Sequence, residues 1–123
     1  MKVLIGDRSE LICERLSAMF GSHTDIEVVA KINDADVINE SIKKFSPDVI
    51  ILDTDMLGNS GTSIISNLKK KLCSILLITL TDNSISQYRS RYLNAGSDYH
   101  FDKAYEFNKI PDAVHSLKIQ YAG

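Results

Sequence analysis

The sequence has 123 residues, 44% of them hydrophobic and 24% charged, a balance ordinary for one globular domain that has its own core. Its formal net charge of -2 and the lack of a basic run give no electrostatic case for direct nucleic-acid binding. No apolar run approaches bilayer length, and the N-terminus lacks the features of a signal peptide. The isolated Cys13 and Cys73 lack metal-ligand spacing and are typical of free thiols in a reducing compartment. We therefore expect a single cytoplasmic domain over residues 1–123, with no membrane partner.

Short apolar runs alternate with amphipathic stretches along the whole chain. Ser9 is placed to cap the first helix and Gly21 to end it, while Asn33 or Asp34 caps the second. Glycine at position 96 closes a weaker, more polar fourth helix. The pattern predicts strands over 2–6, 26–32, 49–52, 75–78 and 97–101, and helices over 9–21, 33–45, 60–72, 83–95 and 107–121.

The third strand, residues 49–52, is the most informative of these elements. It is an unbroken apolar run, VIIL, bounded by a Pro47–Asp48 turn and by Asp53. Such a run is typical of a strand that is buried on both faces of a parallel sheet. Five strand–helix pairs in strict alternation predict an α/β fold, a doubly wound five-stranded parallel sheet with right-handed crossovers. We expect the flavodoxin-like (βα)5 strand order 2-1-3-4-5.

Polar side chains follow four of the five predicted strands. These residues are Asp7, Asp53, Thr79 and Lys103. In an open parallel sheet the carboxyl ends of the strands share one edge, and ligands bind in the crevice beside it. The sequence therefore predicts one small pocket that holds two carboxylates, a hydroxyl and an ammonium group.

Four segments resemble the receiver domain of two-component response regulators, in its stand-alone, chemotaxis-regulator-like form. They are VLIGDRSE (3–10), PDVIILDTDMLGNSG (47–61), ILLITLT (75–81) and AGSDYHFDK (95–103). The resemblance implies a cytoplasmic, bacterial phosphoprotein. It also implies that Asp53 accepts a phosphoryl group from a phosphohistidine of a sensor kinase or phosphotransferase. Thr79 and Lys103 then correspond to the residues that contact the phosphoryl oxygens.

The resemblance also implies a magnesium ion held by acidic residues, and here the chain departs from the family. Asp7 matches the first position of the family's acidic pair, but Arg8 stands at the second, where the family usually has a metal ligand. The expected ligands are Asp7, Asp53 and Asp55, and the added cation should weaken Mg²⁺ binding. Arg8 either pairs with Asp53 in a forked contact or points into solvent.

His100 matches the position of the family's switch residue, which is usually an aromatic side chain that turns inward on phosphorylation. Three interpretations remain open for this histidine. It serves as an altered switch together with Thr79, it is a structural histidine at a strand edge, or it tunes the switch with pH.

All five tyrosines lie in the last third of the chain, near several basic residues. Tyrosine and arginine are enriched at interfaces, and the corresponding face of the family docks partners or a second copy. The residues expected on this face are Tyr88, Tyr92, Tyr99, Arg91 and Lys109. The alternative is that they are ordinary half-buried tyrosines and solvated basic residues. Since the last predicted helix ends at Tyr121, we expect a stand-alone receiver that signals by binding another protein.

Three functional hypotheses follow. The first is a receiver phosphorylated on Asp53, which is a phosphoacceptor rather than an enzyme acting on a separate substrate. The second is a degenerate receiver that serves as a phosphorylation-independent interaction module. The third, a small enzyme or flavin carrier, is disfavoured because GDRSEL (6–11) is poorly suited to cradle a phosphate and GNSG (58–61) lacks the spacing of a nucleophile elbow or Walker loop.

Overall fold

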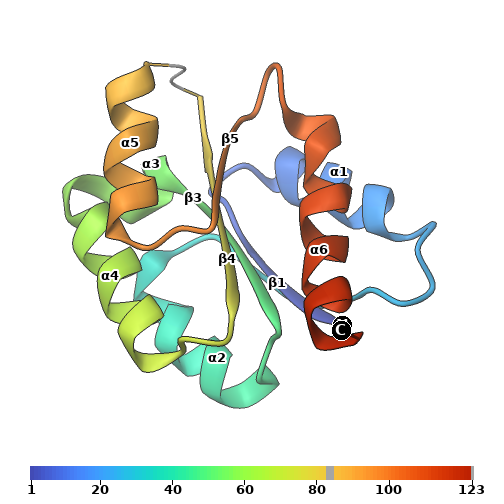
Figure 1. Cartoon of the computed structure of the whole chain (residues 1–123). Helices are drawn as coiled ribbons and strands as arrows, with labels where there is room; N and C mark the ends of the chain where they lie inside the picture. The colour runs from blue at the N-terminus through green and yellow to red at the C-terminus, as the bar shows by residue number, and fades with distance from the viewer. Residues whose placement is uncertain (83–84, 123) are drawn as a thin grey trace.

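A computed structural model of the chain has a parallel sheet at its centre with helices on both faces (Figure 1). The structure describes residues 1–82 and 85–122, and it describes side chains as far as Ser116. The side chains of residues 117–121, which end the last predicted helix, lie outside this part. No helix within it is long and apolar enough to cross a membrane.

All five strands pair in parallel, in the order β2-β1-β3-β4-β5, which confirms the predicted fold class and topology. The strands are β1 (Lys2–Gly6), β2 (Glu27–Ile32), β3 (Val49–Asp53), β4 (Leu76–Thr81) and β5 (Tyr99–Asp102). The α-helices are α1 (Glu10–Phe20), α2 (Ile38–Phe45), α3 (Thr54–Leu57), α4 (Gly61–Lys71), α5 (Ser86–Ala95) and α6 (Ile110–Ala122). Short 3₁₀ turns, η1 (Ala35–Val37), η2 (Gly58–Ser60) and η3 (Phe107–Lys109), precede α2, α4 and α6.

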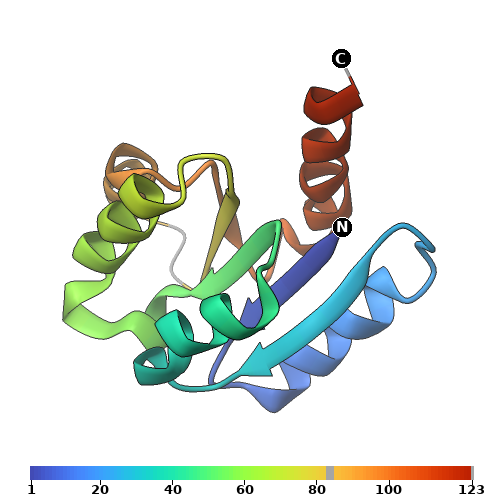
Figure 2. The same cartoon turned by 90° about the horizontal axis from the view of Figure 1, so that it is seen from below.

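The sheet has helices on both of its faces (Figure 2) and separates two apolar clusters of side chains. One cluster is covered by α1 and α6, and the other by α2, α4 and α5. The central strand β3 is buried along its whole length, as its continuous apolar run predicts.

The predicted helix caps are present in the structure. Ser9 Oγ accepts a hydrogen bond from the backbone N–H of Ile12 at 3.3 Å, which satisfies one of the free donors at the start of α1. Of the two candidates for the second cap, Asp34 caps η1. Gly96 ends α5 with φ +126°, a conformation that L side chains rarely adopt.

Several boundaries differ from the predicted ones, and two of the differences affect the site. β4 continues to Thr81 instead of ending at residue 78, because β-branched threonines fit a buried strand as well as the apolar residues before them do. A short helix, α3, starts directly after Asp53, whose side chain caps it by accepting from the Asp55 N–H at 3.2 Å.

Candidate functional site

Asp7, Asp53 and Lys103 meet at the carboxyl edge of the sheet, as the sequence predicts. The ammonium nitrogen of Lys103 lies 2.7 Å from Asp7 Oδ2 and 3.0 Å from Asp53 Oδ1. All three side chains are buried. One cation thus joins two carboxylates that arrive from the neighbouring strands β1 and β3.

Local hydrogen bonds hold each of these residues in place. Asp7 Oδ1 accepts from the backbone N–H of Ser9 at 2.8 Å, which ties it to the start of α1. The Lys103 N–H donates to the backbone carbonyl of Thr81 at 2.9 Å, and so extends the β4–β5 pairing past the last residue of β5. Asp102 Oδ1 accepts from the N–H groups of Ala104 and Tyr105, which fixes the turn that follows Lys103.

The charges of the cluster depend strongly on one another. Burial raises the pKa of Asp7 above its usual value, although the contact with Lys103 opposes this shift. Burial also acts to lower the pKa of Lys103, but its bonds to Asp7 and Asp53 outweigh that effect and raise it. Lys103 is therefore a permanent cation at neutral pH.

The acidic residues fit a magnesium ion in donor type, because Mg²⁺ prefers carboxylate and carbonyl oxygens. Asp7 and Asp53 present buried carboxylates, while the Asp55 side chain is exposed at the rim. Partial burial, followed by the nearby Asp53 carboxylate, raises the pKa of Asp55. Lys103 already balances part of the negative charge, so a metal ion has less charge to neutralise than in a purely acidic site.

Arg8 does not contact Asp53. Its side chain is exposed, and it takes part in none of the ion pairs among residues 1–82 and 85–116. Of the two alternatives, the structure has the one in which Arg8 points into solvent. Together with Asp7, Glu10, Glu14 and Lys31 it lines a cleft of about 320 Å³ next to the cluster.

Thr79 does not join the cluster. Its Oγ1 lies 3.0 Å from Ser97 Oγ and 2.7 Å from His100 Nδ1. In the sheet Thr79 pairs with Leu52, whereas Asp53 pairs with Leu80, so Thr79 lies one residue short of the level of Asp53 and Thr81 lies one residue beyond it. The predicted strand end at residue 78 was wrong, and because β4 continues to Thr81, Thr79 is an interior residue of the strand.

The residue at the end of β4 is Thr81. It is buried, and its carbonyl accepts from the Lys103 N–H. Asp82 follows, with Oδ2 at 3.9 Å from the Lys103 ammonium and its side chain 67% exposed. The sequence reasoning missed both residues, although the alternating TLT pattern of 79–81 was a usable signal for a longer strand.

His100 is buried in β5 between the sheet and α5. Its ring stacks on Tyr92, with centroids 5.5 Å apart and planes inclined by 17°, and meets the Tyr88 ring edge-on. Nδ1 is bonded to Thr79, while Nε2 is buried and has no hydrogen-bond partner in the described part of the chain. Burial, followed by the nearby Arg89, lowers the pKa of His100 to about 4, so the ring is neutral at pH 7.

The expected partner face is only partly exposed. Tyr92 is 3% exposed, which contradicts its prediction as a docking residue. Tyr88 and Tyr99 are half-buried, and the Tyr99 hydroxyl bonds to Ser116. The exposed side chains on and around α5 and the turn after β5 include those of Ile85, Arg91, Leu93, Tyr105 and Lys109.

A sequence model described as the response regulator receiver domain matches residues 3–115. The Fimbriae Z protein of Salmonella typhimurium is 24% identical over 120 residues, which are 98% of this chain and 57% of that protein. A protein-glutamate methylesterase/protein-glutamine glutaminase of Hydrogenovibrio crunogenus is 36% identical over 84 residues, 67% of this chain and 22% of that protein. The chain thus spans less than two thirds of the length of either relative.

Solved structures share the fold at low sequence identity. The signal receiver domain of NarL from Mycobacterium tuberculosis has a TM-score of 0.83 at 22% identity, with 95% of each chain covered. The isolated REC domain of RcsB from Salmonella enterica serovar Typhimurium, determined in the presence of the phosphomimetic BeF3-, has a TM-score of 0.87 at 22% identity. That match covers 96% of this chain and 88% of the other.

Proposed function

This chain belongs to the response regulator receiver domain family, and on that premise we propose that it accepts a phosphoryl group on Asp53 from the phosphohistidine of a sensor kinase or phosphotransferase. The observation that carries the proposal is the buried cluster in which Lys103 contacts both Asp7 and Asp53. The proposal treats residues 1–123 as one cytoplasmic receiver domain. It is a phosphoacceptor and does not act on a separate substrate.

In the proposed step a carboxylate oxygen of Asp53 attacks phosphorus, a P–O bond forms, and the P–N bond to the donor histidine breaks. The leaving imidazole takes up a proton. A carboxylate is a modest nucleophile, so the site contributes mainly positioning and charge neutralisation. Lys103 lies 3.0 Å from Asp53 Oδ1 and is placed to balance the charge on the incoming phosphoryl oxygens.

We assign the hydroxyl contact to Thr81 rather than Thr79. Thr81 is the last residue of β4, and its carbonyl is bonded to the Lys103 N–H. Thr79 is placed instead to act with His100 as the switch, because its hydroxyl bonds to the imidazole. A magnesium ion, when bound, would be held by Asp7, Asp53 and Asp55 and would neutralise phosphoryl charge.

The signal is proposed to leave through a protein partner or a second copy of the chain. A docking surface around α5 and β5 is supported by side chains of three kinds. They are the half-buried Tyr88 and Tyr99, the exposed Arg91 and Lys109, and the exposed apolar Ile85 and Leu93. The buried Tyr92 supports this surface from beneath.

The test is incubation with a small-molecule phosphodonor, with and without Mg²⁺, followed at once by intact-mass measurement. We expect one added phosphoryl group, dependent on Mg²⁺ and absent from Asp53→Asn. As a matched control, Asp48→Asn changes a carboxylate before β3 and should leave the adduct intact. No adduct in the parent under any condition would favour the degenerate, phosphorylation-independent receiver.

The variant Arg8→Asp tests the metal part of the proposal. Replacing a cation by an anion beside Asp7 should raise the apparent Mg²⁺ affinity by about tenfold, measured as the Mg²⁺ concentration that gives half-maximal adduct formation. An unchanged Mg²⁺ dependence would show that Arg8 has no influence on the metal.

A further inference from the structure

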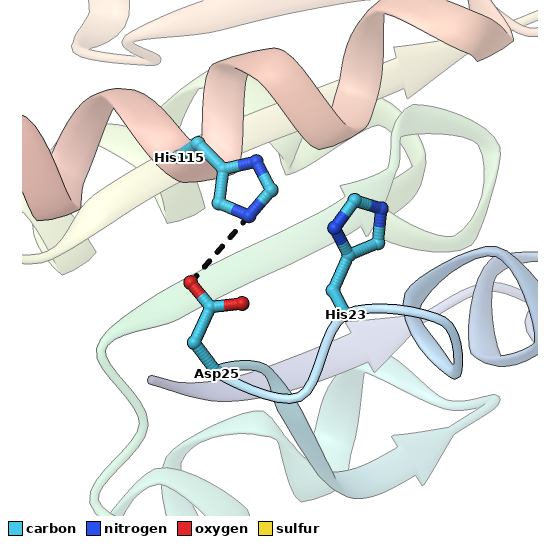
Figure 3. A group of neighbouring side chains, drawn as sticks. All are labelled: His23, Asp25 and His115. Carbon is cyan, nitrogen blue, oxygen red and sulfur yellow. Dashed lines mark ion pairs between the residues drawn. The ribbon is translucent and has the colours of Figure 1, made fainter.

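We propose that His23, Asp25 and His115 form a binding site for a divalent transition-metal ion of the zinc class. Figure 3 shows the three side chains facing one another, two from the loop between α1 and β2 and one from α6. This site is separate from the acidic cluster and plays no part in the proposed phosphoryl transfer.

The distances between the three ligand atoms suit binding of one metal ion. Each residue offers one ligand atom, and the three atoms lie within 4.8 Å of one another. His115 Nε2 and Asp25 Oδ2 are 3.5 Å apart, which is long for a hydrogen bond. Two ligands on one tetrahedral zinc, with bonds of 2.0–2.1 Å, are separated by about 3.3 Å. The distance between the Asp25 and His115 ligand atoms is therefore already close to the distance expected when both bind the same zinc ion.

The backbone holds the three residues in this arrangement. The His23 N–H donates to the Phe20 carbonyl at 2.9 Å, and the His23 carbonyl accepts from the Ile26 N–H at 3.2 Å. The Asp25 carbonyl accepts from the N-terminal ammonium group of Met1 at 2.6 Å. His115 follows the buried Val114 on α6, so the packing of that helix fixes where the imidazole lies.

The donor set selects the metal. Two imidazoles and one carboxylate suit zinc and similar divalent transition metals, whereas Mg²⁺ and Ca²⁺ prefer oxygen ligands alone. The side chains of His115 and Asp25 are 30% and 31% exposed, so an ion can enter from solvent. Three protein ligands leave a fourth tetrahedral position for water or for a group of a partner molecule.

The position of the site means that a bound metal ion would connect two separate parts of the fold. The loop that carries His23 and Asp25 leads into β2, and the Glu27 N–H bonds to the Met1 carbonyl, so the site lies at the amino edge of the sheet. Asp7 and Asp53 lie at the opposite, carboxyl edge. A bound ion would fasten α6 to the α1–β2 loop and stabilise the native state without touching the phosphoryl site.

Zinc titration of the untagged full chain tests the inference. All proteins carry Cys73→Ser, because Cys73 is an exposed free thiol and thiolates compete as zinc ligands. By calorimetry we expect one zinc ion per chain at micromolar affinity or tighter, unaffected by millimolar Mg²⁺. Saturating zinc should raise the Tm by roughly 5 °C. Asp53→Asn should bind zinc equally, which separates this test from that of the proposed function.

Variants and histidine spectra identify the ligands. His23→Gln, Asp25→Asn and His115→Gln should each weaken zinc binding by about tenfold or more, while Thr24→Ala in the same loop and Asp112→Asn on the same helix should not. The chain has three histidines. In imidazole ¹⁵N spectra of the Cys73→Ser parent, zinc should shift the His23 and His115 resonances and leave buried His100 unchanged. Unshifted His23 and His115 resonances, or equal zinc affinity in the parent and the His115→Gln variant, would overturn the proposal.

Discussion

The Lys103 ammonium lies 2.7 Å from Asp7 Oδ2, so the loop after β5 is tied to the end of β1 across the intervening strands β3 and β4. The contact is buried, and burial acts on the two pKa values in opposite directions, upward for Asp7 and downward for Lys103. The pKa of Asp7 is raised because burial dominates, and the pKa of Lys103 is raised because its carboxylate contacts dominate. The ionised form of Asp7 in the proposed site is therefore less favourable in the folded chain than in the unfolded chain.

We expect Asp7→Asn to be more stable than the parent at pH 7, by about 1 kcal/mol. Because the folded-state pKa of Asp7 is raised, the folded chain holds this proton more tightly than the unfolded chain does. Ionised Asp7 thus lowers the free energy of unfolding above its raised pKa, and this cost disappears as the pH falls below it. Urea unfolding between pH 3 and pH 8 should show the two proteins converging in acid. A parent more stable than the variant at pH 7 would contradict the assignment.

The two threonines of β4 should behave differently. Thr79→Val removes a hydroxyl that bonds to Ser97 and His100, so we expect a loss of about 1–3 kcal/mol in the free energy of unfolding with an unchanged rate of adduct formation. Thr81→Val should slow adduct formation by about tenfold or more, because a donor to the phosphoryl oxygens is lost. Intact-mass time courses and urea unfolding of both variants measure these effects. The reverse pattern would restore Thr79 to the phosphoryl site.

His100 should make the protein sensitive to acid. Its pKa is lowered to about 4, from an ordinary value of about 6.5, so the unfolded chain takes up this proton first. The stabilising contribution is complete above pH 6.5 and is lost as the pH falls towards 4, by about 3 kcal/mol. The free energy of unfolding of His100→Phe should fall less steeply over this window than that of the parent. Parallel curves would mean that His100 is not protected from protonation.

Gly61 allows the Tyr92 hydroxyl to approach the start of α4. A Cβ at position 61 would overlap the phenolic oxygen of Tyr92, whose ring is confined by its stack on His100. Gly61→Ala should therefore lower the free energy of unfolding by about 2 kcal/mol. In a Tyr92→Phe background, which lacks that oxygen, the same change should cost much less. Thermal unfolding of the four proteins in this cycle gives the coupling, and purely additive effects would argue against the clash.

The sequence by itself determined the fold and the centre of the site. Hydrophobic runs and helical spacing are local properties, and strict strand–helix alternation restricts the chain to a parallel sheet. Asp7, Asp53 and Lys103 could be predicted because residues that follow parallel strands arrive at the same edge. Arg8 stands out in the sequence as a departure from the family, but the direction of its side chain depends on its surroundings in the folded chain.

Only the tertiary structure decided which other side chains belong together. The end of β4 depends on pairing with β5, so Thr81 and Asp82 replaced the expected Thr79 at the strand end. Tyr92 is buried because α5 packs it against His100, a contact that composition cannot reveal. His23 and Asp25 meet His115 only because α6 returns to the amino edge of the sheet, and no local pattern predicts the meeting of residues so far apart in the chain.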